Sequence, residues 1–298
     1  MNSVETFPLK PPVNYYEGPE NSLEEIEMHL LQFTGGTIDL NKSDSGIATL
    51  CINHYKKRNA ISGKMMVELG RVVAELEAWR DGKGVIVYGS GGTFCSGGDL
   101  DMARRTGCTA DGFKMSAYMT HVLDRLERLP LLTVALIEGS GALGGGAEVA
   151  LACDFRLLAS GCAGVGAVHA RMGLTPAWGG AGRLVALLGR RRALHLLATA
   201  RVVPPQEALA LGLADALLGP QPHQSVLAAA EAWLRERTRA PAEVIRALKV
   251  MCDARAHALD ERRIFAPLWG ASANRHALAS RPRHTSAPAD GDQEPTTR

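Results

Sequence analysis

Apolar side chains recur along the chain with two different periods. Short apolar or alternating runs bounded by glycine or polar turns predict strands at 37–41, 46–53, 84–88, 131–137 and 154–159. Apolar positions three or four residues apart predict helices at 22–33, 62–79 and 111–129, and a short apolar helix around Glu148. After residue 182 the helical period dominates, and we expect helices at 183–188, 191–198, 205–211, 225–239, 242–256 and 260–279. This order predicts an α/β fold with a helical C-terminal third.

The same pattern divides the chain into four parts. Residues 1–36 are expected to form an N-terminal arm with a short helix, and 37–222 a core that carries the active site. Residues 223–280 form a helical region, and 281–298 lack apolar anchors and are expected to be disordered. Within the core, 161–182 is expected to be a long irregular segment, which in compact domains is usually functional.

Composition narrows the class of protein and its location. The 298 residues are 46% hydrophobic and 21% charged, with a net charge of +2, which is typical of a globular protein and argues against a nucleic-acid binder. No apolar run reaches the roughly 20 residues that span a bilayer, and the N-terminus is not typical of a targeting peptide. The 6 cysteines lack a CxxC pair and favour reduced thiols, so we expect a cytosolic protein that contacts no membrane.

The stretch 130–154 combines the features of a reactive site. A buried strand leads into a glycine turn, Gly144–Gly146, and then into a short helix that carries Glu148. Glycines let a ligand approach the backbone, and a helix N-terminus directs N–H groups and a positive dipole end at it. Its apolar neighbours favour burial of Glu148. Donors for a developing anion beside a carboxylate indicate enolate chemistry.

Three other chemistries fit less well. Residues 139–144 match GxGxxG after a strand, but they lie in mid-chain, and no second strand ends in an acid about 20 residues later, as a dinucleotide site requires. The chain has no GxSxG segment for a serine hydrolase. It also has no HxxxH pair suited to a metal.

Taken together, the glycine loops and their flanking segments resemble a known family. The segments FCSGGD (94–99) and ALGGGAE (142–148) occur with NHYKKRNAIS, ACDFRLLA and MGLTPAWGGAGRL. Over roughly 37–279 the chain resembles the crotonase, or enoyl-CoA hydratase/isomerase, superfamily. The resemblance implies a spiral of ββα units with a C-terminal helical trimerisation region and an acyl-CoA substrate. It also implies a homotrimer or homohexamer that needs no cofactor or metal.

The resemblance assigns roles to four residues. Gly98 and Gly145 would form an oxyanion hole for the thioester oxygen through their N–H groups, and Glu148 matches the first catalytic glutamate. His169 stands where hydratases carry a second glutamate, so water addition by two carboxylates is not expected. His169 is either a neutral filler or a hydrogen-bonding acid beside the substrate α-carbon.

Finer details resemble the decarboxylating members of the family. The segments FTGGTIDL, VHARMGLTPAWGG, PAEVIRALK and LWGASANRHAL carry this likeness. It implies removal of the free carboxylate of ethylmalonyl-CoA, and more weakly of methylmalonyl-CoA, as proofreading of side products of acetyl-CoA carboxylase. Such a reaction needs an oriented C–CO₂⁻ bond, an oxyanion hole and a desolvating pocket. Candidate pocket residues are Val168, Leu174 and Trp178.

Several alternatives remain at this point. The basic loop Lys56, Lys57 and Arg58 either contacts coenzyme A or is a solvated charge run, and Arg262 and Arg263 are expected to complete a neighbouring subunit's nucleotide site. Either Glu148 or His169 protonates the enolate. Competing functions are an enoyl-CoA hydratase or isomerase and a non-catalytic binding protein of the same fold.

Overall fold

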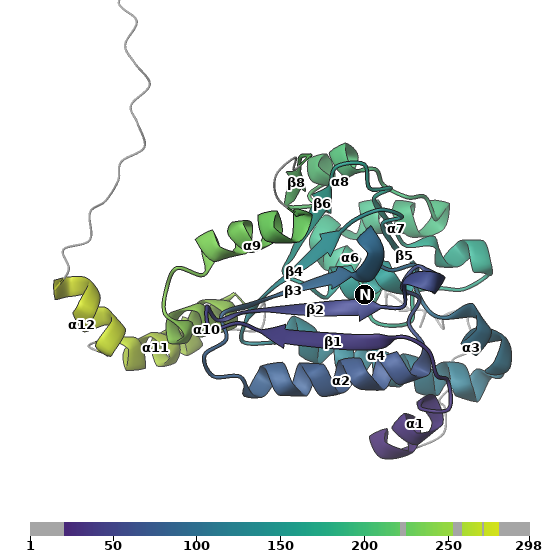
Figure 1. Ribbon diagram of the computed structural model, residues 1–298, viewed down its shortest axis with the longest axis horizontal. Coiled ribbons are helices and arrows are strands. Elements are labelled where there is room, and N and C mark those ends of the chain that lie inside the picture. The colour runs from purple at the N-terminus through teal and green to yellow at the C-terminus, as the bar shows by residue number, and fades with distance from the viewer. Residues whose placement is uncertain (1–20, 221–224, 253–257, 270, 280–298) are drawn as a thin grey trace, which may run out of the picture.

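The computed structural model describes residues 21–220, 225–252, 258–269 and 271–279. Most of the predicted N-terminal arm and the predicted disordered tail therefore lie outside the described residues. Six strands form one sheet in the order β1-β2-β3-β4-β6-β8, in which β1 is antiparallel to β2 and the other neighbours are parallel (Figure 1). Their bounds are Thr37–Lys42, Ile47–Asn53, Gly84–Gly89, Leu132–Ile137, Phe155–Ala159 and Ala216–Leu218.

Both faces of the central strands are buried, which explains their continuous apolar runs. On β3, Val85 and Val87 belong to the main core, whereas Ile86 belongs to a second cluster on the opposite face. Helices α2 (Gly63–Ala78) and α4 (Thr109–Glu127) supply the main core, and α9 (Val226–Arg237) covers the other face (Figure 1). The sheet is thus packed between two helical layers.

A second, shorter set of strands runs beside the carboxyl ends of the sheet. Strands β5 (Ala142–Leu143) and β7 (Val165–Gly166) pair in parallel. Single bridges extend this ladder, joining Ile61 to Gly98, Cys95 to Ala142 and Val165 to Val203. Successive chain turns therefore pass from a long strand to a short pairing and then to a helix, which confirms the expected spiral of ββα units.

The other helices largely follow the predicted pattern. They are α1 (Leu23–Leu30), α3 (Leu100–Arg105), α5 (Gly145–Leu151), α6 (Gly180–Leu188), α7 (Arg190–Thr199), α8 (Pro205–Leu211), α10 (Ala242–Met251), α11 (Ala258–Phe265) and α12 (Ser272–Ala279). Single 3₁₀ turns are η1 (Tyr55–Lys57), η2 (Ser90–Gly92), η3 (Val168–Met172) and η4 (Ala266–Leu268). The predicted helix 260–279 is divided, since η4 with Pro267 separates α11 from α12.

The prediction of an irregular 161–182 segment was wrong in part. This stretch contains β7 and η3, and α6 begins at Gly180. Strand β8 and helix α3 were also not predicted. The elements β7, η3, β8 and α3 have two to six residues, too few to show a period, and β7 and β8 are defined by pairing with distant chain. All six cysteines are free thiols, and no helix in the described ranges is long and apolar enough to cross a bilayer.

Candidate active site

A cavity of about 650 Å³ opens where the short ladder meets α3, α4 and η3. All seven residues predicted for the catalytic groups and the acyl pocket line it: Gly98, Gly145, Glu148, Val168, His169, Leu174 and Trp178. Trp178 is buried, whereas Leu174 is 64% exposed. Lys56 and Arg58 are exposed and are not among the lining residues. The structure thus brings together residues from four separate chain segments.

The first donor, the N–H of Gly98, is directed by a strand-like pairing with Ile61. The N–H of Ile61 donates to the Gly97 carbonyl over 2.8 Å, and the Asp99 N–H donates to the Ile61 carbonyl over 2.9 Å. Since groups alternate in direction along an extended chain, the N–H of the intervening Gly98 points the other way. It donates to no acceptor in the described part of the chain, and Gly98 lines the cavity.

The second donor, the N–H of Gly145, is the first of helix α5 and has no partner inside that helix. Gly144 precedes it with φ 55° and ψ −125°, a conformation that requires glycine. The two donor loops lie close together, because a Cβ added at Gly97 would lie 3.2 Å from the Gly145 nitrogen. Gly98 and Gly145 therefore present neighbouring free N–H groups, the arrangement that an oxyanion hole needs.

Trp178 sets which residues the donor loops tolerate. A Cβ at Gly145 would lie 2.4 Å from Cζ3 of the Trp178 ring, whereas one at Gly98 would lie 3.9 Å from Cζ2. The indole packs under Gly145 and is 3% exposed, and its Nε1 donates to Sδ of Met115 over 3.2 Å. The predicted pocket residue Trp178 is therefore also the support of the second donor.

The Glu148 carboxylate is 2% exposed and fully engaged. Its Oε1 accepts from the Ala177 N–H over 3.2 Å, and its Oε2 accepts from the N–H groups of Trp178 and Gly180 over 2.8 Å each. A carboxylate only accepts, so three backbone donors suit its ionised form. Glu148 thereby fastens the 177–180 turn to α5 as well as facing the cavity.

Helix α4 holds the same turn from the opposite side. Ser116 Oγ donates to the Ala177 carbonyl over 2.6 Å, and Thr120 Oγ1 donates to it over 3.2 Å. Arg183 donates to the Trp178 carbonyl over 2.8 Å and forms ion pairs with Asp124 and Glu127 of α4. Sequence patterns gave no signal for these anchors, since they lie far from the glycine loops along the chain.

His169 lies beside the first glutamate. Its Nε2 is 3.1 Å from Oε1 of Glu148, and the side chain is 12% exposed. The buried Nδ1 has no hydrogen-bond partner among the described residues. A neutral ring with the proton on Nε2 satisfies this geometry, because it donates to Glu148 without burying an unpaired N–H. His169 therefore interacts with the Glu148 carboxylate.

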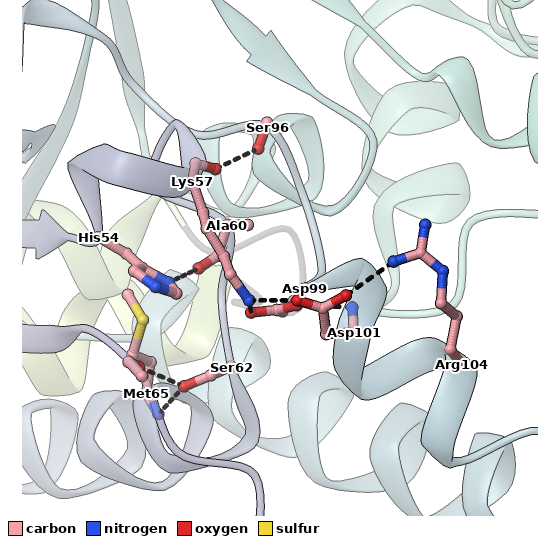
Figure 2. A network of polar contacts seen from close by, with 10 residues as sticks. His54, Lys57, Ala60, Ser62, Met65, Ser96, Asp99, Asp101 and Arg104 are labelled. Carbon is pink, nitrogen blue, oxygen red and sulfur yellow. Dashed lines mark hydrogen bonds and ion pairs between the residues drawn. The ribbon is translucent and has the colours of Figure 1, made fainter.

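The side chain of Lys57, the middle residue of the basic loop, turns toward the acids at the start of α3. Its Nζ contacts Oδ2 of Asp99 at 2.7 Å and Oδ2 of Asp101 at 2.8 Å, while Arg104 bonds the other oxygen of Asp101 (Figure 2). These contacts raise the pKa of Lys57, with Asp101 the larger cause. Burial alone would raise the pKa of Asp99, but the bonds from Lys57 and the Asp101 N–H lower it overall.

Two lining or flanking residues were not assigned from sequence. Asp99 lines the cavity and is 5% exposed. Asn59, with φ 56°, is wholly buried and bonds the carbonyls of Ser90 and Thr93 through its amide. Asp99 lies in the segment SGGD, and Asn59 lies in the segment RNAIS. The signal that could have identified them was a polar residue within a recognised loop. In the part of the chain that the structure describes, no group of three metal-ligating side chains is arranged to hold an ion.

Known proteins are similar to this chain in sequence or in fold. The ethylmalonyl-CoA decarboxylase of Xenopus laevis is 47% identical over 266 residues, covering 87% of this chain and 88% of that protein. That of Danio rerio is 48% identical over 268 residues, with coverage of 87% and 88%. A putative enoyl-CoA hydratase from Thermobifida fusca YX, solved in complex with acetoacetyl-CoA, has a TM-score of 0.65 and 26% identity, covering 82% of this chain and 95% of its own.

The family assignment rests on the greater part of the sequence. The enoyl-CoA hydratase/isomerase family matches residues 42–266, which include every residue that lines the cavity. The donor loops and Glu148 lie within that match, as do all strands of the sheet from β2 onward. The chain therefore belongs to the enoyl-CoA hydratase/isomerase family.

Proposed function

We propose that the protein decarboxylates ethylmalonyl-CoA and, more slowly, methylmalonyl-CoA. The observation that carries this proposal is His169 paired with Glu148 beside two free backbone donors. A hydratase needs a second carboxylate at the place that this imidazole occupies. The relatives named above are ethylmalonyl-CoA decarboxylases at 47% and 48% identity, which supports the same substrate class.

The cavity suits loss of carbon dioxide from a malonyl thioester. The C–CO₂⁻ bond breaks, its electron pair enters the thioester to form an enolate, and CO₂ leaves. The N–H groups of Gly98 and Gly145 stabilise the enolate oxygen, each contributing roughly 3–4 kcal/mol. No lysine or arginine is among the described residues that line the cavity, so a substrate carboxylate there loses hydration without gaining a cation.

Reaction ends when a proton reaches the α-carbon, and we assign its delivery to His169. Glu148 is committed to three backbone N–H groups, which suit its carboxylate form. The imidazole Nε2 lies beside that carboxylate and close to the donor loop, since a Cβ at Gly144 would be 4.0 Å from it. Protonation from solvent converts the neutral ring to an imidazolium, which gives one proton to the α-carbon and returns to the neutral ring, while Glu148 orients it.

Two assays test the reaction. CO₂ release from ethylmalonyl-CoA is expected, with little hydration of crotonyl-CoA. Hydration without CO₂ release would instead support an enoyl-CoA hydratase, and neither activity would support the non-catalytic binding protein.

The His169→Gln variant, studied in D₂O, tests the proton donor. Glutamine keeps a donor toward Glu148 but provides no acid. The α-carbon of the product should therefore gain deuterium without preference for one face, whereas the wild-type protein labels one face. Facial selectivity that survives in the variant would assign protonation to Glu148.

We further propose that Lys56 and Arg58 contact coenzyme A, that the protein is cytosolic, and that it forms a homotrimer or homohexamer. The exposed basic side chains beside the cavity loop support the first point. Exposed apolar residues Val185, Leu187 and Leu194 on α6 and α7 support assembly. Light scattering of the purified protein tests the oligomer, and a rise in KM for Lys56→Met and Arg58→Met tests the coenzyme A contact.

A further inference from the structure

We infer that Lys57 is a positioning residue for the reaction, because its ion pair with Asp99 holds the N–H of Gly98 toward the substrate. This inference rests on the proposed use of Gly98 as an oxyanion donor. Lys57 does not line the cavity, and its effect on the reaction passes through the backbone of the donor segment 96–99.

The loop 57–61 holds the donor segment through several main-chain and side-chain contacts. Ile61 pairs with Gly97 and Asp99 through the main chain, on either side of Gly98. Lys57 grips Asp99 by its ammonium, and its carbonyl accepts from Ser96 Oγ over 3.3 Å (Figure 2). Ser96 N–H also donates to the Arg58 carbonyl over 3.1 Å. The direction of the Gly98 N–H is therefore set by how firmly this loop holds its neighbours.

The buried carboxylate of Asp99 requires the positive charge of Lys57 as its partner. Its Oδ1 accepts from the Asp101 N–H over 2.7 Å and caps α3, while Oδ2 accepts from Lys57. The side chain of Asp99 is 4% exposed, against 40% for Lys57. Without the lysine, a buried carboxylate beside the cavity would lack a counter-charge, and such a group moves toward water or disturbs its surroundings. The backbone that moves with Asp99 is the backbone that carries Gly98.

A role in binding coenzyme A is the competing explanation for this lysine. Two carboxylates within 2.8 Å already engage its ammonium, which leaves less capacity for a phosphate than its exposed neighbours Lys56 and Arg58 retain. The two explanations differ in kinetics. A positioning residue changes the transition state and lowers kcat, whereas a phosphate contact changes KM.

The test compares Lys57→Met, Lys57→Arg, Asp99→Asn and the double variant Lys57→Met/Asp99→Asn. Lys42→Met is the matched control, since Lys42 also pairs with a carboxylate, Glu75, but is not among the residues that line the cavity. We expect Lys57→Met to lower kcat for ethylmalonyl-CoA by about tenfold to a hundredfold. This loss is smaller than that expected from complete removal of an oxyanion-hole donor. KM should change little. Lys57→Arg should restore most of kcat, and Lys42→Met should leave it unchanged.

A spectroscopic readout separates this inference from the proposed function. Isotope-edited infrared spectra of bound butyryl-CoA, labelled at the thioester carbonyl, report hydrogen bonding to that oxygen without any reaction. The carbonyl frequency should shift less in Lys57→Met and Asp99→Asn than in the wild type. The double variant should resemble either single one, because both remove the same interaction.

Three results would overturn the inference. They are a wild-type infrared shift in both single variants, a raised KM with wild-type kcat in Lys57→Met, or fully additive losses in the double variant. Asp99→Asn keeps the shape of the side chain, so it remains informative if Lys57→Met does not fold. Absence of CO₂ release by the wild type would refute the proposed function, yet the carbonyl shift would still decide the role of Lys57.

Discussion

The two backbone donors of the cavity are held in place by different physical means. Gly145 is buried, begins helix α5 and rests on the Trp178 ring, so its N–H direction follows from helix geometry and apolar packing. Gly98 is exposed to the cavity. Its position depends on the main-chain pairing of its neighbours with Ile61 and on the ion pair between Asp99 and the half-exposed Lys57. One donor is fixed by the core, and the other is fixed by polar contacts at the surface.

The site is rigid around Gly145 and adjustable around Gly98. Close packing around Gly145 tolerates no added atom, because interiors are packed to crystal-like density. The contacts around Gly98 are long-range in sequence and partly solvated, so they weaken with changes of charge that would not affect Gly145.

Matched alanine substitutions at the two donors should give the largest contrast. In Gly145→Ala the new methyl would meet the Trp178 ring at 2.4 Å, so the donor or the indole must shift. We expect kcat to fall by about 10²–10³-fold, as for loss of an oxyanion donor. Gly98→Ala meets its nearest atom only at 3.9 Å, at a φ that alanine accepts, and should lose much less. Equal losses in the CO₂ assay would contradict the difference in packing.

Glu148→Gln should loosen the Gly145 side of the cavity. An amide replaces one acceptor oxygen with an NH₂ group, which then faces a backbone N–H of the 177–180 turn or the imidazole of His169. Leaving such a buried donor unpaired costs about 1–3 kcal/mol of unfolding free energy. Urea denaturation measures this loss, and kcat should fall with it. An unchanged denaturation midpoint would show that Glu148 does not hold the turn.

Ser116→Ala tests that second support from α4. The substitution removes the 2.6 Å bond to the Ala177 carbonyl but leaves the Thr120 bond to the same oxygen. We expect the unfolding free energy to fall by about 1 kcal/mol and kcat to fall slightly, because the Ala177 carbonyl still accepts the hydrogen bond from Thr120. Adding Thr120→Val should then cost more than in a protein with Ser116 intact. Independent, additive effects would mean that the two hydroxyls do not share this role.

Acid should remove the ionic support of the Gly98 side. The lowered pKa of Asp99 means that its ion pair stabilises the fold above the ordinary value near 3.9 and loses that effect as pH falls through the folded-state value. Because the pKa of Lys57 is raised, the ion pair persists as the pH rises past about 10.4, the ordinary pKa of a lysine. The difference in denaturation midpoint between wild type and Lys57→Met should therefore be constant from about pH 5 to 9 and shrink below about pH 4. A constant difference down to pH 2 would contradict this account.

Much of the site is a local property of the sequence. Gly144–Gly146 and the SGGD loop indicate donors because only glycine permits such backbone directions and close approach, and Glu148 follows within the same turn. The long strands and amphipathic helices show a period over enough residues to be recognised, and the structure places them within a few residues of the expected bounds. His169 at the second glutamate position was likewise visible in the order of residues alone.

The tertiary structure decided which groups face each other. Three sets of contacts join segments that are far apart in the chain. They are the pairing of β5 with β7, the three backbone N–H groups that donate to Glu148, and the ion pair between Lys57 and Asp99. Lys57 illustrates the reason. From sequence it belonged to a run of three cations that either contacts coenzyme A or is solvated, and only burial of Asp99 beside it distinguished it from its neighbours. Sequence determined the chemistry of the donors, whereas long-range packing and charge pairing determined what holds them.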